Sequence, residues 1–187
     1  MLTRSLEGSA SAPPPLDFHA VYRQHVQQVA RWVTRLGGPV LEVDDVVQEI
    51  FMTVYRLLSS FRGASKLSTW LYSITEHAVM TRRRKERFRR MFTFSADPYQ
   101  YEVTAQGPTP LEELERRQSA RVLYRALEGV AENYRAIFIL FEIEGLSGEE
   151  IAELTGLTLP TVWVRLSRAR KKLIARIEKE RGSHGGE

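Results

Sequence analysis

Apolar residues recur along this chain at the spacings of three and four residues that mark amphipathic helices. One such segment follows Asp17, which can cap a helix, and runs to the helix-stopping triplet GGP at 37–39. A second apolar stripe covers about 43–61, and a third follows Ser68, another residue suited to a helix cap. The pattern therefore predicts three helices in the first half of the chain.

The second half of the chain has a helical pattern of its own. Apolar positions within 114–127 and 134–143 predict two helices, and Gly145 is suited to end the second. Between the halves, residues 95–110 show no sustained period and contain three prolines, which is typical of a linker. We therefore expect an all-α chain of two small helical domains joined by a flexible linker. The expected divisions are a disordered tail at 1–15, a first domain at 16–94, the linker at 95–110, a second domain at 111–181 and a disordered tail at 182–187.

The stretch SGEEIAELTGLTLPTVWVRLSRARKKLIAR at 147–176 predicts a helix, a tight turn and a second helix. Ser147 and Glu150 have the spacing of a capping box, in which each side chain accepts a backbone N–H of the other residue. Gly156 permits the positive φ of a turn, and Pro160 suits the first turn of the next helix, where its missing N–H costs nothing. The C-terminal domain is therefore expected to contain a helix-turn-helix.

The second helix of this pair is amphipathic. Its apolar positions are Val162, Leu166, Ala169 and Leu173. Its other face carries Arg165, Arg168, Arg170, Lys171, Lys172 and Arg176. An anchored helix with such a cationic face is typical of the DNA-reading helix of a helix-turn-helix. The alternative is an ordinary helical hairpin with a solvated basic surface, because helix-turn-helix patterns are short and also match by chance.

The net charge is only +4, but the charges are unevenly distributed. Residues 66–90 hold eight Lys and Arg against two Glu, and residues 161–181 hold the same numbers, so each block carries +6. Between these blocks, residues 111–160 hold ten Glu against five Arg. This distribution indicates two separate contacts with anionic partners.

The first basic block ends in the run RRRKERFRR at 82–90, with Phe88 inside it and Phe92 just beyond. Cations mixed with aromatic rings suit phosphates together with stacking on unpaired bases. This run is therefore a candidate site for single-stranded nucleic acid. The alternative is a solvated helix end.

The predicted second helix also has a polar face. Rotation by about 100° per residue brings together Asp45, Gln48, Glu49, Met52 and Arg56. Such a face suits the docking of a protein partner, and the alternative is that its acidic residues only offset the helix macrodipole. We discount metal catalysis at Asp44, Asp45 and Glu49, because no second element supplies a further acidic pair nearby.

Composition excludes several function classes. The chain has no cysteine, so neither a disulfide nor a thiolate metal site is possible, and a cytoplasmic location is expected. No apolar run approaches the roughly 20 residues of a membrane helix, and the N-terminus lacks the apolar core of a secretion signal. Neither convergent carboxylates nor a nucleophile and base are visible in the sequence, so we expect no enzyme activity, cofactor, metal or small-molecule substrate.

Three stretches carry a resemblance to a known family: VDDVVQEIFMTVYR from Val43, STWLYSIT from Ser68 with the basic run after it, and EGLSGEEIAELTGLTLPTVWVRLSRARKKL from Glu144. In this order they resemble the extracytoplasmic-function group of bacterial sigma-70-type sigma factors, over about 18–176. The resemblance implies an alternative sigma factor that binds bacterial core RNA polymerase and directs transcription initiation at particular promoters. Compact members of this group are typically held inactive by an anti-sigma factor, so we expect such a partner.

The resemblance also assigns a role to each domain. The first domain would be sigma region 2, which binds core polymerase, melts the promoter DNA and recognises the minus-ten element. The second would be sigma region 4, whose helix-turn-helix recognises the minus-thirty-five element.

Three sets of site residues follow from this resemblance. The core-polymerase-binding set is Asp44, Asp45, Gln48, Glu49, Met52 and Arg56. The minus-ten set is Arg62, Lys66, Ser68, Trp70, His77, Arg82, Arg83, Arg84, Lys85 and Arg87. The minus-thirty-five set is Pro160, Thr161, Trp163, Val164, Arg165, Arg168, Arg170, Lys171 and Lys172. Arg165 is the first candidate for reading a guanine, which an arginine can do bidentately.

Several positions depart from the usual family pattern. His77 and Thr81 stand where an Asn and an Asp are common, which bears on the promoter sequence and not on the class. Trp163 and Val164 replace residues that are more often polar. Either the upstream element is read with more apolar contact than usual, or Trp163 packs against the hairpin.

The competing function is a stand-alone helix-turn-helix regulator that binds an operator, usually as a dimer. This interpretation explains the second domain. It gives no role to the basic and aromatic run at 82–90, whereas promoter melting does.

Overall fold

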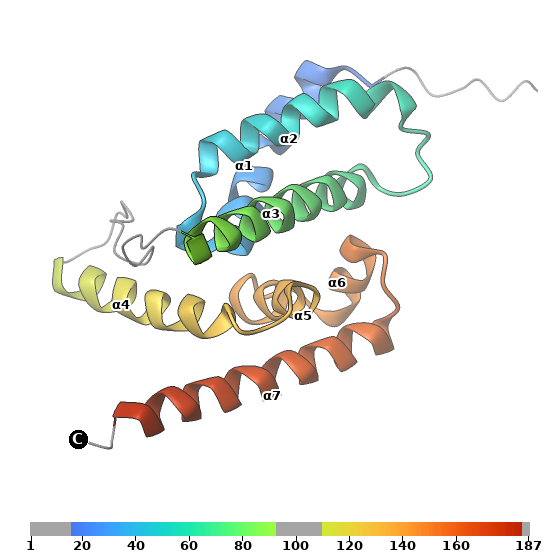
Figure 1. Cartoon of the computed structure of the whole chain (residues 1–187). Coiled ribbons are helices and arrows are strands. Elements are labelled where there is room, and N and C mark those ends of the chain that lie inside the picture. The colour runs from blue at the N-terminus through green and yellow to red at the C-terminus, as the bar shows by residue number, and fades with distance from the viewer. Residues whose placement is uncertain (1–15, 93–109, 185–187) are drawn as a thin grey trace, which may run out of the picture.

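The structure, a computed structural model, describes residues 16–92 and 110–184, with side chains in the second segment described for 119–179. Within these ranges the regular structure is helical and no strand occurs. The first domain holds α1 (Phe18–Gly37), the 3₁₀ turn η1 (Gly38–Val40), α2 (Val43–Leu57), the 3₁₀ turn η2 (Leu58–Ser60) and α3 (Leu67–Phe92). The second holds α4 (Pro110–Leu127), α5 (Glu132–Phe138), the π-helical turn η4 (Ile139–Ile143), α6 (Gly148–Thr155) and α7 (Leu159–His184) (Figure 1). The predicted all-α fold in two helical domains is confirmed.

The ends of α1 agree with the sequence prediction. The carboxylate of Asp17 accepts the backbone N–H groups of His19 and Ala20, which satisfies two of the donors that a helix start leaves free. At the other end, Gly38 has φ +68 and donates its N–H to the carbonyl of Thr34. A β-carbon disfavours this backbone region, so the glycine ends the helix at low cost.

Three boundaries differ from prediction. Helix α3 begins at Leu67, and the N–H of Trp70 donates to the carbonyl of Lys66 at 3.1 Å, so Ser68 lies inside the first turn and the predicted cap is wrong. Helix α2 ends at Leu57 and passes into η2, which leaves Phe61 outside the regular helix. Helix α7 continues to His184 through residues predicted as tail, because a single glycine at 182 costs only about 1 kcal/mol in a helix.

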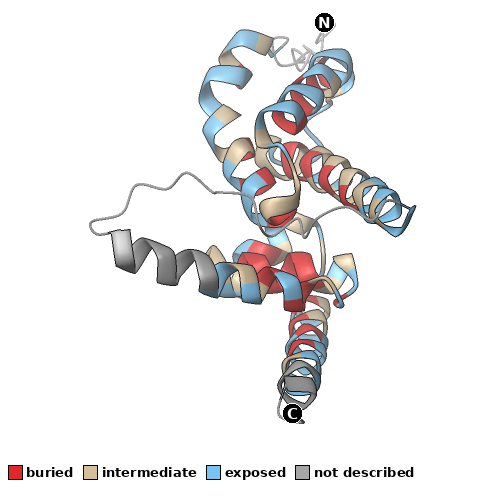
Figure 2. Cartoon of the chain, turned by 60° about the vertical axis from the view of Figure 1, so that its left-hand side comes forward, coloured by how far each residue is buried: buried red, intermediate tan, exposed pale blue. Residues whose placement is uncertain are grey.

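Each domain buries its own apolar core. In the first domain α1, α2 and α3 pack against one another around residues such as Val33, Ile50 and Leu71, none of which is exposed. In the second, α5 and α7 pack most extensively, and Figure 2 shows the buried residues gathered where the helices meet. Leu140 of η4 and Val162 of α7 are fully buried there. Full burial of a large aliphatic side chain contributes about 1.5–3 kcal/mol, so these two cores account for most of the stability of the helices.

The two domains also contact each other directly. Helix α6 lies against α3, α4 lies against η1, and η4 lies against α1 (Figure 1). Residues 93–109, which hold nearly all of the predicted linker, lie outside the described residues, and Pro110 is already the first residue of α4. No described helix is long and apolar enough to cross a bilayer. The contact between the domains bears on every candidate site below.

Candidate nucleic-acid interface

The polar face of α2 lines a shallow hollow of about 520 Å³. Its walls include the predicted polymerase-binding residues Asp45, Gln48, Glu49, Met52 and Arg56. Across the hollow, α3 supplies Thr81, Arg82 and Lys85. Five of the six residues of the set therefore share one concave surface, with Asp44 beside it on the same helix.

An aromatic groove of about 670 Å³ continues from this surface between α1 and α2. The ring of Phe18 lies edge-on to Tyr55 at 5.2 Å between centroids, and Tyr22 lies edge-on to Phe51 at 4.7 Å. Tyr55 and Met52 are 68% and 58% exposed, which is high for large apolar side chains. Sequence reasoning missed Tyr55, although it stands next to the polar face of α2 in the quoted stretch VDDVVQEIFMTVYR.

Glu49 joins the predicted polymerase face to the predicted minus-ten set. Its carboxylate accepts the Nε–H of Arg82 in α3 at 2.8 Å. Both side chains are nearly half exposed, so this ion pair contributes little to stability. The two predicted sites therefore adjoin along the α2–α3 edge.

The minus-ten set is spread along α3 and the loop before it. Arg62, Lys66 and His77 are exposed, Ser68 is half-buried, and Trp70 packs against Phe61 with ring centroids 5.1 Å apart. In the basic run, Arg84, Lys85 and Arg87 are exposed and Arg82 is half-buried. Phe88 is 63% exposed and stacks at a tilt on Phe92, at 4.7 Å. The aromatic residues of this run thus face solvent, as contact with bases would require.

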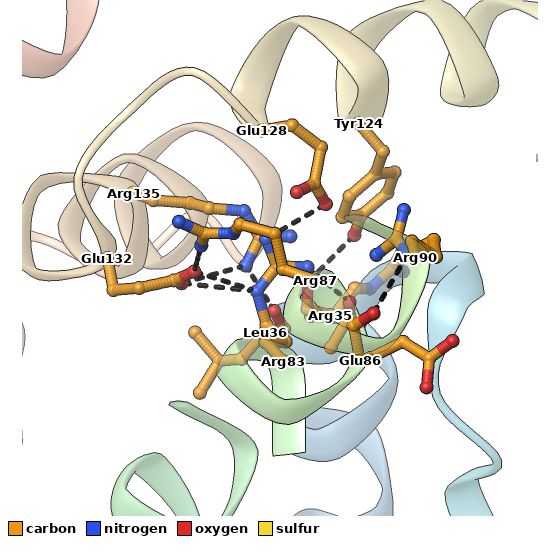
Figure 3. Close-up of polar contacts among 11 residues, drawn as sticks. Arg35, Leu36, Arg83, Glu86, Arg87, Arg90, Tyr124, Glu128, Glu132 and Arg135 are labelled. Atoms are coloured by element: carbon orange, nitrogen blue, oxygen red, sulfur yellow. Dashed lines mark hydrogen bonds and ion pairs between the residues drawn. The ribbon is translucent and has the colours of Figure 1, made fainter. Parts of the chain in front are cut away.

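Arg83 is the exception in this run, since its side chain is only 2% exposed. It lies between the domains, with Glu128 and Glu132 of the second domain beside it (Figure 3). It also donates to the carbonyl of Gly37 at the end of α1. The sequence placed Arg83 among exposed cations. Periodicity within α3 describes only the faces of that helix. It therefore could not show that the opposite domain buries one residue of the run.

The helix-turn-helix has the local geometry that its sequence predicts. Ser147 Oγ accepts the N–H of Glu150, and the Glu150 carboxylate accepts the N–H of Ser147 at 2.8 Å. The hydrogen bond from the Ser147 backbone N–H, followed by the interaction with the Ser147 hydroxyl, lowers the pKa of the Glu150 carboxyl. Gly156 has φ +69 at the turn, and Ile151 and Leu166 pack in the core between the two helices.

The cations of α7 are held by two residues that the sequence did not single out. Arg168 donates to the hydroxyl of Tyr134 at 3.1 Å, which lowers the pKa of that hydroxyl. Arg170 donates to the carboxylate of Glu142 at 2.7 Å. These partners come from α5 and η4, so packing of the second domain sets the direction of the cations.

The N-terminal part of α7 shows two different environments. Trp163 lies edge-on to Phe141 at 5.6 Å and against Gly148, yet it keeps 43% of its surface exposed. The second alternative for Trp163, packing against the hairpin, therefore holds for part of the ring. Val164 is 49% exposed, whereas Arg165 is half-buried. Burial raises the pKa of the Glu76 carboxyl in the opposite domain, and the positive charge of Arg165 partly offsets this rise. Of the rest of the set, Thr161 is half-buried and Pro160, Lys171 and Lys172 are exposed.

Among the residues that the structure describes, no group of His, Asp and Glu is arranged to hold a metal ion. The side chains described above offer ion pairing, hydrogen bonding and aromatic contact. These are the interactions that bind proteins and nucleic acids.

Family models match both halves of the chain. The model described as Sigma-70 region 2 matches residues 21–89, and the model described as Sigma-70, region 4 matches residues 111–173. The first match covers α1 to α3, and the second covers the helix-turn-helix with the helices before it.

Full-length relatives agree with these matches. The chain is 33% identical to the ECF RNA polymerase sigma factor SigE of Mycolicibacterium smegmatis, over 89% of this chain and 63% of that protein. It is 30% identical to the RNA polymerase sigma factor YlaC of Bacillus subtilis, over 86% of this chain and 92% of YlaC. It is also 30% identical to the ECF RNA polymerase sigma-E factor of Escherichia coli, over 86% of each chain.

Solved structures show the same fold. CnrH, solved in complex with the cytosolic domain of CnrY, matches with a TM-score of 0.54 and 26% identity, over 87% of this chain and 88% of CnrH. The sigma factor RpoE of Bartonella quintana, solved in complex with the anti-sigma factor NepR, matches with a TM-score of 0.58 and 23% identity, over 87% of this chain and 97% of RpoE. Family models match both halves of the chain, and the chain covers most of the length of relatives to which it is 30% identical. The chain therefore belongs to the extracytoplasmic-function group of the sigma-70 family of RNA polymerase sigma factors.

Proposed function

We propose that this chain is an alternative sigma factor, which binds bacterial core RNA polymerase and directs initiation at a specific set of promoters. The observation that carries this function is the presence, in one chain, of a region 2 domain with an exposed concave polar face and a region 4 domain with a basic second helix. An initiation factor has to hold polymerase and promoter DNA at the same time. The two domains supply separate surfaces for these two tasks.

The polymerase-binding surface is the hollow on α2 with the aromatic groove beside it. Asp45, Gln48 and Glu49 supply hydrogen-bond acceptors and charge, and Met52 and Tyr55 supply exposed apolar area next to them. A polar rim around a small apolar centre is the usual composition of a protein interface. The mixed polar and apolar character of this surface suits an amphipathic helix of the polymerase.

The promoter-binding surfaces lie on α3 and α7. The exposed cations of the run at 82–90 contact the phosphates of the melted strand, and Trp70, Phe88 and Phe92 offer rings on which unpaired bases stack. On α7, Arg165 and Arg168 contact the duplex of the minus-thirty-five element, with Val164 near thymine methyl groups. The sigma factor makes no covalent change to the DNA, and the polymerase synthesises the RNA.

An anti-sigma factor is the proposed inhibitor. The support is that RpoE of Bartonella quintana, which shares this fold, was solved with the anti-sigma factor NepR. The exposed aromatic groove between α1 and α2 is the surface that suits such a partner, because occupation of it would also block the polymerase. Since it acts on polymerase, the chain works in the bacterial cytoplasm.

The function is tested by mixing the purified full-length chain with bacterial core RNA polymerase. We expect the two to co-elute, and the complex to give run-off transcripts from DNA upstream of the gene that encodes this chain. Absence of binding to core polymerase, with affinity for duplex DNA retained, would contradict the proposal. That result would favour the operator-binding regulator, which needs only the second domain.

A further inference from the structure

Tyr134 of α5 lies against cations of α7, although it belongs to none of the predicted sets of site residues. Helix α5 packs closely on α7 (Figure 1). The guanidinium carbon of Arg168 lies 5.9 Å from the centroid of the Tyr134 ring, and Nζ of Lys172 lies at the same distance. One Nη of Arg168 also donates to the Tyr134 hydroxyl at 3.1 Å. The aromatic side chain is therefore held in place by two cations of the recognition helix.

These cations belong to one face of α7. Arg165, Arg168 and Lys172 follow one another at spacings of three and four residues, which brings them onto the same side of a helix. The hydrogen bond and the charge of Arg168 lower the pKa of the Tyr134 hydroxyl, and the charges of Lys172 and Arg165 act in the same direction. The hydroxyl thus lies in a strongly positive local field.

The positive charge at Tyr134 is not neutralised by carboxylates of the domain. Arg170, two residues further along α7 than Arg168, pairs with the carboxylate of Glu142. Within residues 16–92 and 119–179, by contrast, neither Arg168 nor Lys172 forms an ion pair, and both are exposed. Their charges are therefore available to an anion from outside the chain.

The Tyr134 hydroxyl has a hydrogen-bond donor to offer the same anion. A tyrosine hydroxyl carries one proton and can also accept. Because Arg168 already donates to its oxygen, the proton of the hydroxyl remains free to point away from Arg168. A hydroxyl, a guanidinium and an ammonium around one point suit an anion with several oxygens, such as a phosphate.

The position of the site along α7 indicates which phosphate it would meet. A recognition helix puts its N-terminal residues against the base edges in the major groove, and the sugar-phosphate backbones flank that groove. Val164 and Arg165 lie in the N-terminal part of α7, whereas Arg168 and Lys172 lie about one and two turns further on. The backbone at the edge of the groove is therefore within reach of these later cations and of Tyr134 beside them.

We propose that Tyr134, Arg168 and Lys172 form a binding site for one backbone phosphate of the minus-thirty-five duplex. The Tyr134 hydroxyl donates to a phosphate oxygen, Arg168 donates to the same phosphate, and Lys172 adds its charge. The site fixes the depth of α7 in the groove and reads no base. The identity of the anion rests on the proposed function in one respect only, which is that α7 binds duplex DNA.

The test is Tyr134→Phe in the full-length chain, which removes the hydroxyl and keeps the ring with its cation contacts. Affinity is measured by fluorescence anisotropy for two labelled duplexes of equal length, one from DNA upstream of the gene that encodes this chain and one unrelated. We expect the substitution to weaken binding to both by about tenfold, because a hydrogen bond to a charged group is lost. The loss is equal because a phosphate is present in every sequence.

A double-mutant cycle assigns the hydroxyl to the phosphate that Arg168 holds. The two backgrounds are Arg168→Ala and Arg170→Ala, each of which removes one exposed cation of α7. In the first background Tyr134→Phe should cost less than about twofold, because the shared phosphate is no longer held there. In the second it should still cost about tenfold, because Arg170 faces Glu142 instead.

The pH dependence distinguishes a donor from a residue that only packs. A deprotonated Tyr134 has no proton to donate and repels a phosphate. The charged groups that act on this hydroxyl are Arg165, Arg168 and Lys172, and together they hold its pKa below the ordinary value of 10.0. The advantage of wild type over Tyr134→Phe should therefore be full at neutral pH and shrink as the pH rises toward 10.0.

Three outcomes overturn the proposal: a Tyr134→Phe variant that binds both duplexes within about twofold of wild type, a loss restricted to one duplex, and equal losses in the two arginine backgrounds. A loss restricted to one duplex would show that Tyr134 reads a base. None of these measurements needs polymerase. Failure of the wild-type chain to bind core polymerase, with the expected duplex results, therefore counts against the proposed function and leaves the phosphate site standing.

Discussion

The indole ring of Trp163 lies so close to Gly148 that a β-carbon there would stand 2.4 Å from its Cζ2 atom. Gly148 is the first residue of α6 and Trp163 lies in the first turns of α7, so this contact joins the two helices of the helix-turn-helix. Trp163 nevertheless remains 43% exposed. One residue thus packs between the two helices and contributes to the proposed minus-thirty-five surface.

Gly148→Ala should destabilise the second domain, because the added methyl group has to displace the indole ring. Overpacking of this kind costs about 1–3 kcal/mol, more than the gain in helix propensity from glycine to alanine. Urea denaturation followed by circular dichroism measures the loss in the free energy of unfolding. In the Trp163→Ala background the same substitution should cost much less, and an equal cost in both backgrounds would show that the ring is not the obstacle.

Glu150→Gln should lower stability at neutral pH and have no effect in acid. The pKa of Glu150 is lower in the folded chain than the ordinary value of 4.5, so the unfolded chain binds its proton more readily. The stabilisation from the charged carboxylate is therefore present above pH 4.5 and is lost as the pH falls through the folded pKa. Urea titrations of both proteins over a pH series measure this difference.

The Glu150→Gln series has its own control, because glutamine can still accept the N–H of Ser147. Ser147→Ala should instead still cost about 0.5–2 kcal/mol in acid, since it removes the neutral half of the capping box. A pH-independent difference for Glu150→Gln would show that the charge of the carboxylate is not what stabilises the cap.

Asp45→Arg should weaken binding to core polymerase by about tenfold or more, because it places a cation on the concave face of α2. Binding of the same variant to duplex DNA through α7 should stay at the wild-type level. Glu178→Arg changes the net charge by the same amount at an exposed position of α7 and serves as the control. Polymerase affinity retained in the Asp45 variant, measured by surface plasmon resonance, would refute the assignment of this face.

Arg165→Ala should cost about 1–3 kcal/mol in binding to the cognate minus-thirty-five element if the guanidinium reads a base. The loss should be restricted to that sequence, with little change for unrelated duplexes. Lys171→Ala is the comparison, since an exposed lysine that contacts phosphate should weaken binding to all duplexes and reduce the salt dependence. A uniform, salt-sensitive loss for Arg165→Ala would assign that side chain to phosphate.

Local signals in the sequence were sufficient for much of the fold. The Asp17 cap, the capping box of Ser147 and Glu150 and the turn at Gly156 depend on neighbours within four residues, and all three have the predicted geometry. The cap predicted at Ser68 failed, because the backbone had already entered α3 one residue earlier, at Leu67. Tyr55 and the aromatic groove beside α2 also escaped prediction, since the groove forms only when α1 packs against α2.

The helices, the family and the distribution of charge could all be predicted from the amino-acid sequence, because periodicity, caps and motifs are properties of residues close together in the chain. The environment of Arg83 could not, since this residue lies 45 and 49 residues before its partners Glu128 and Glu132. In the sequence, the run that contains Arg83 is typical of a row of solvated cations, and the acidic stretch is typical of a separate surface. Their contact depends on how two finished domains pack, since burial and ion pairing between distant segments arise only when the folded chain brings them together.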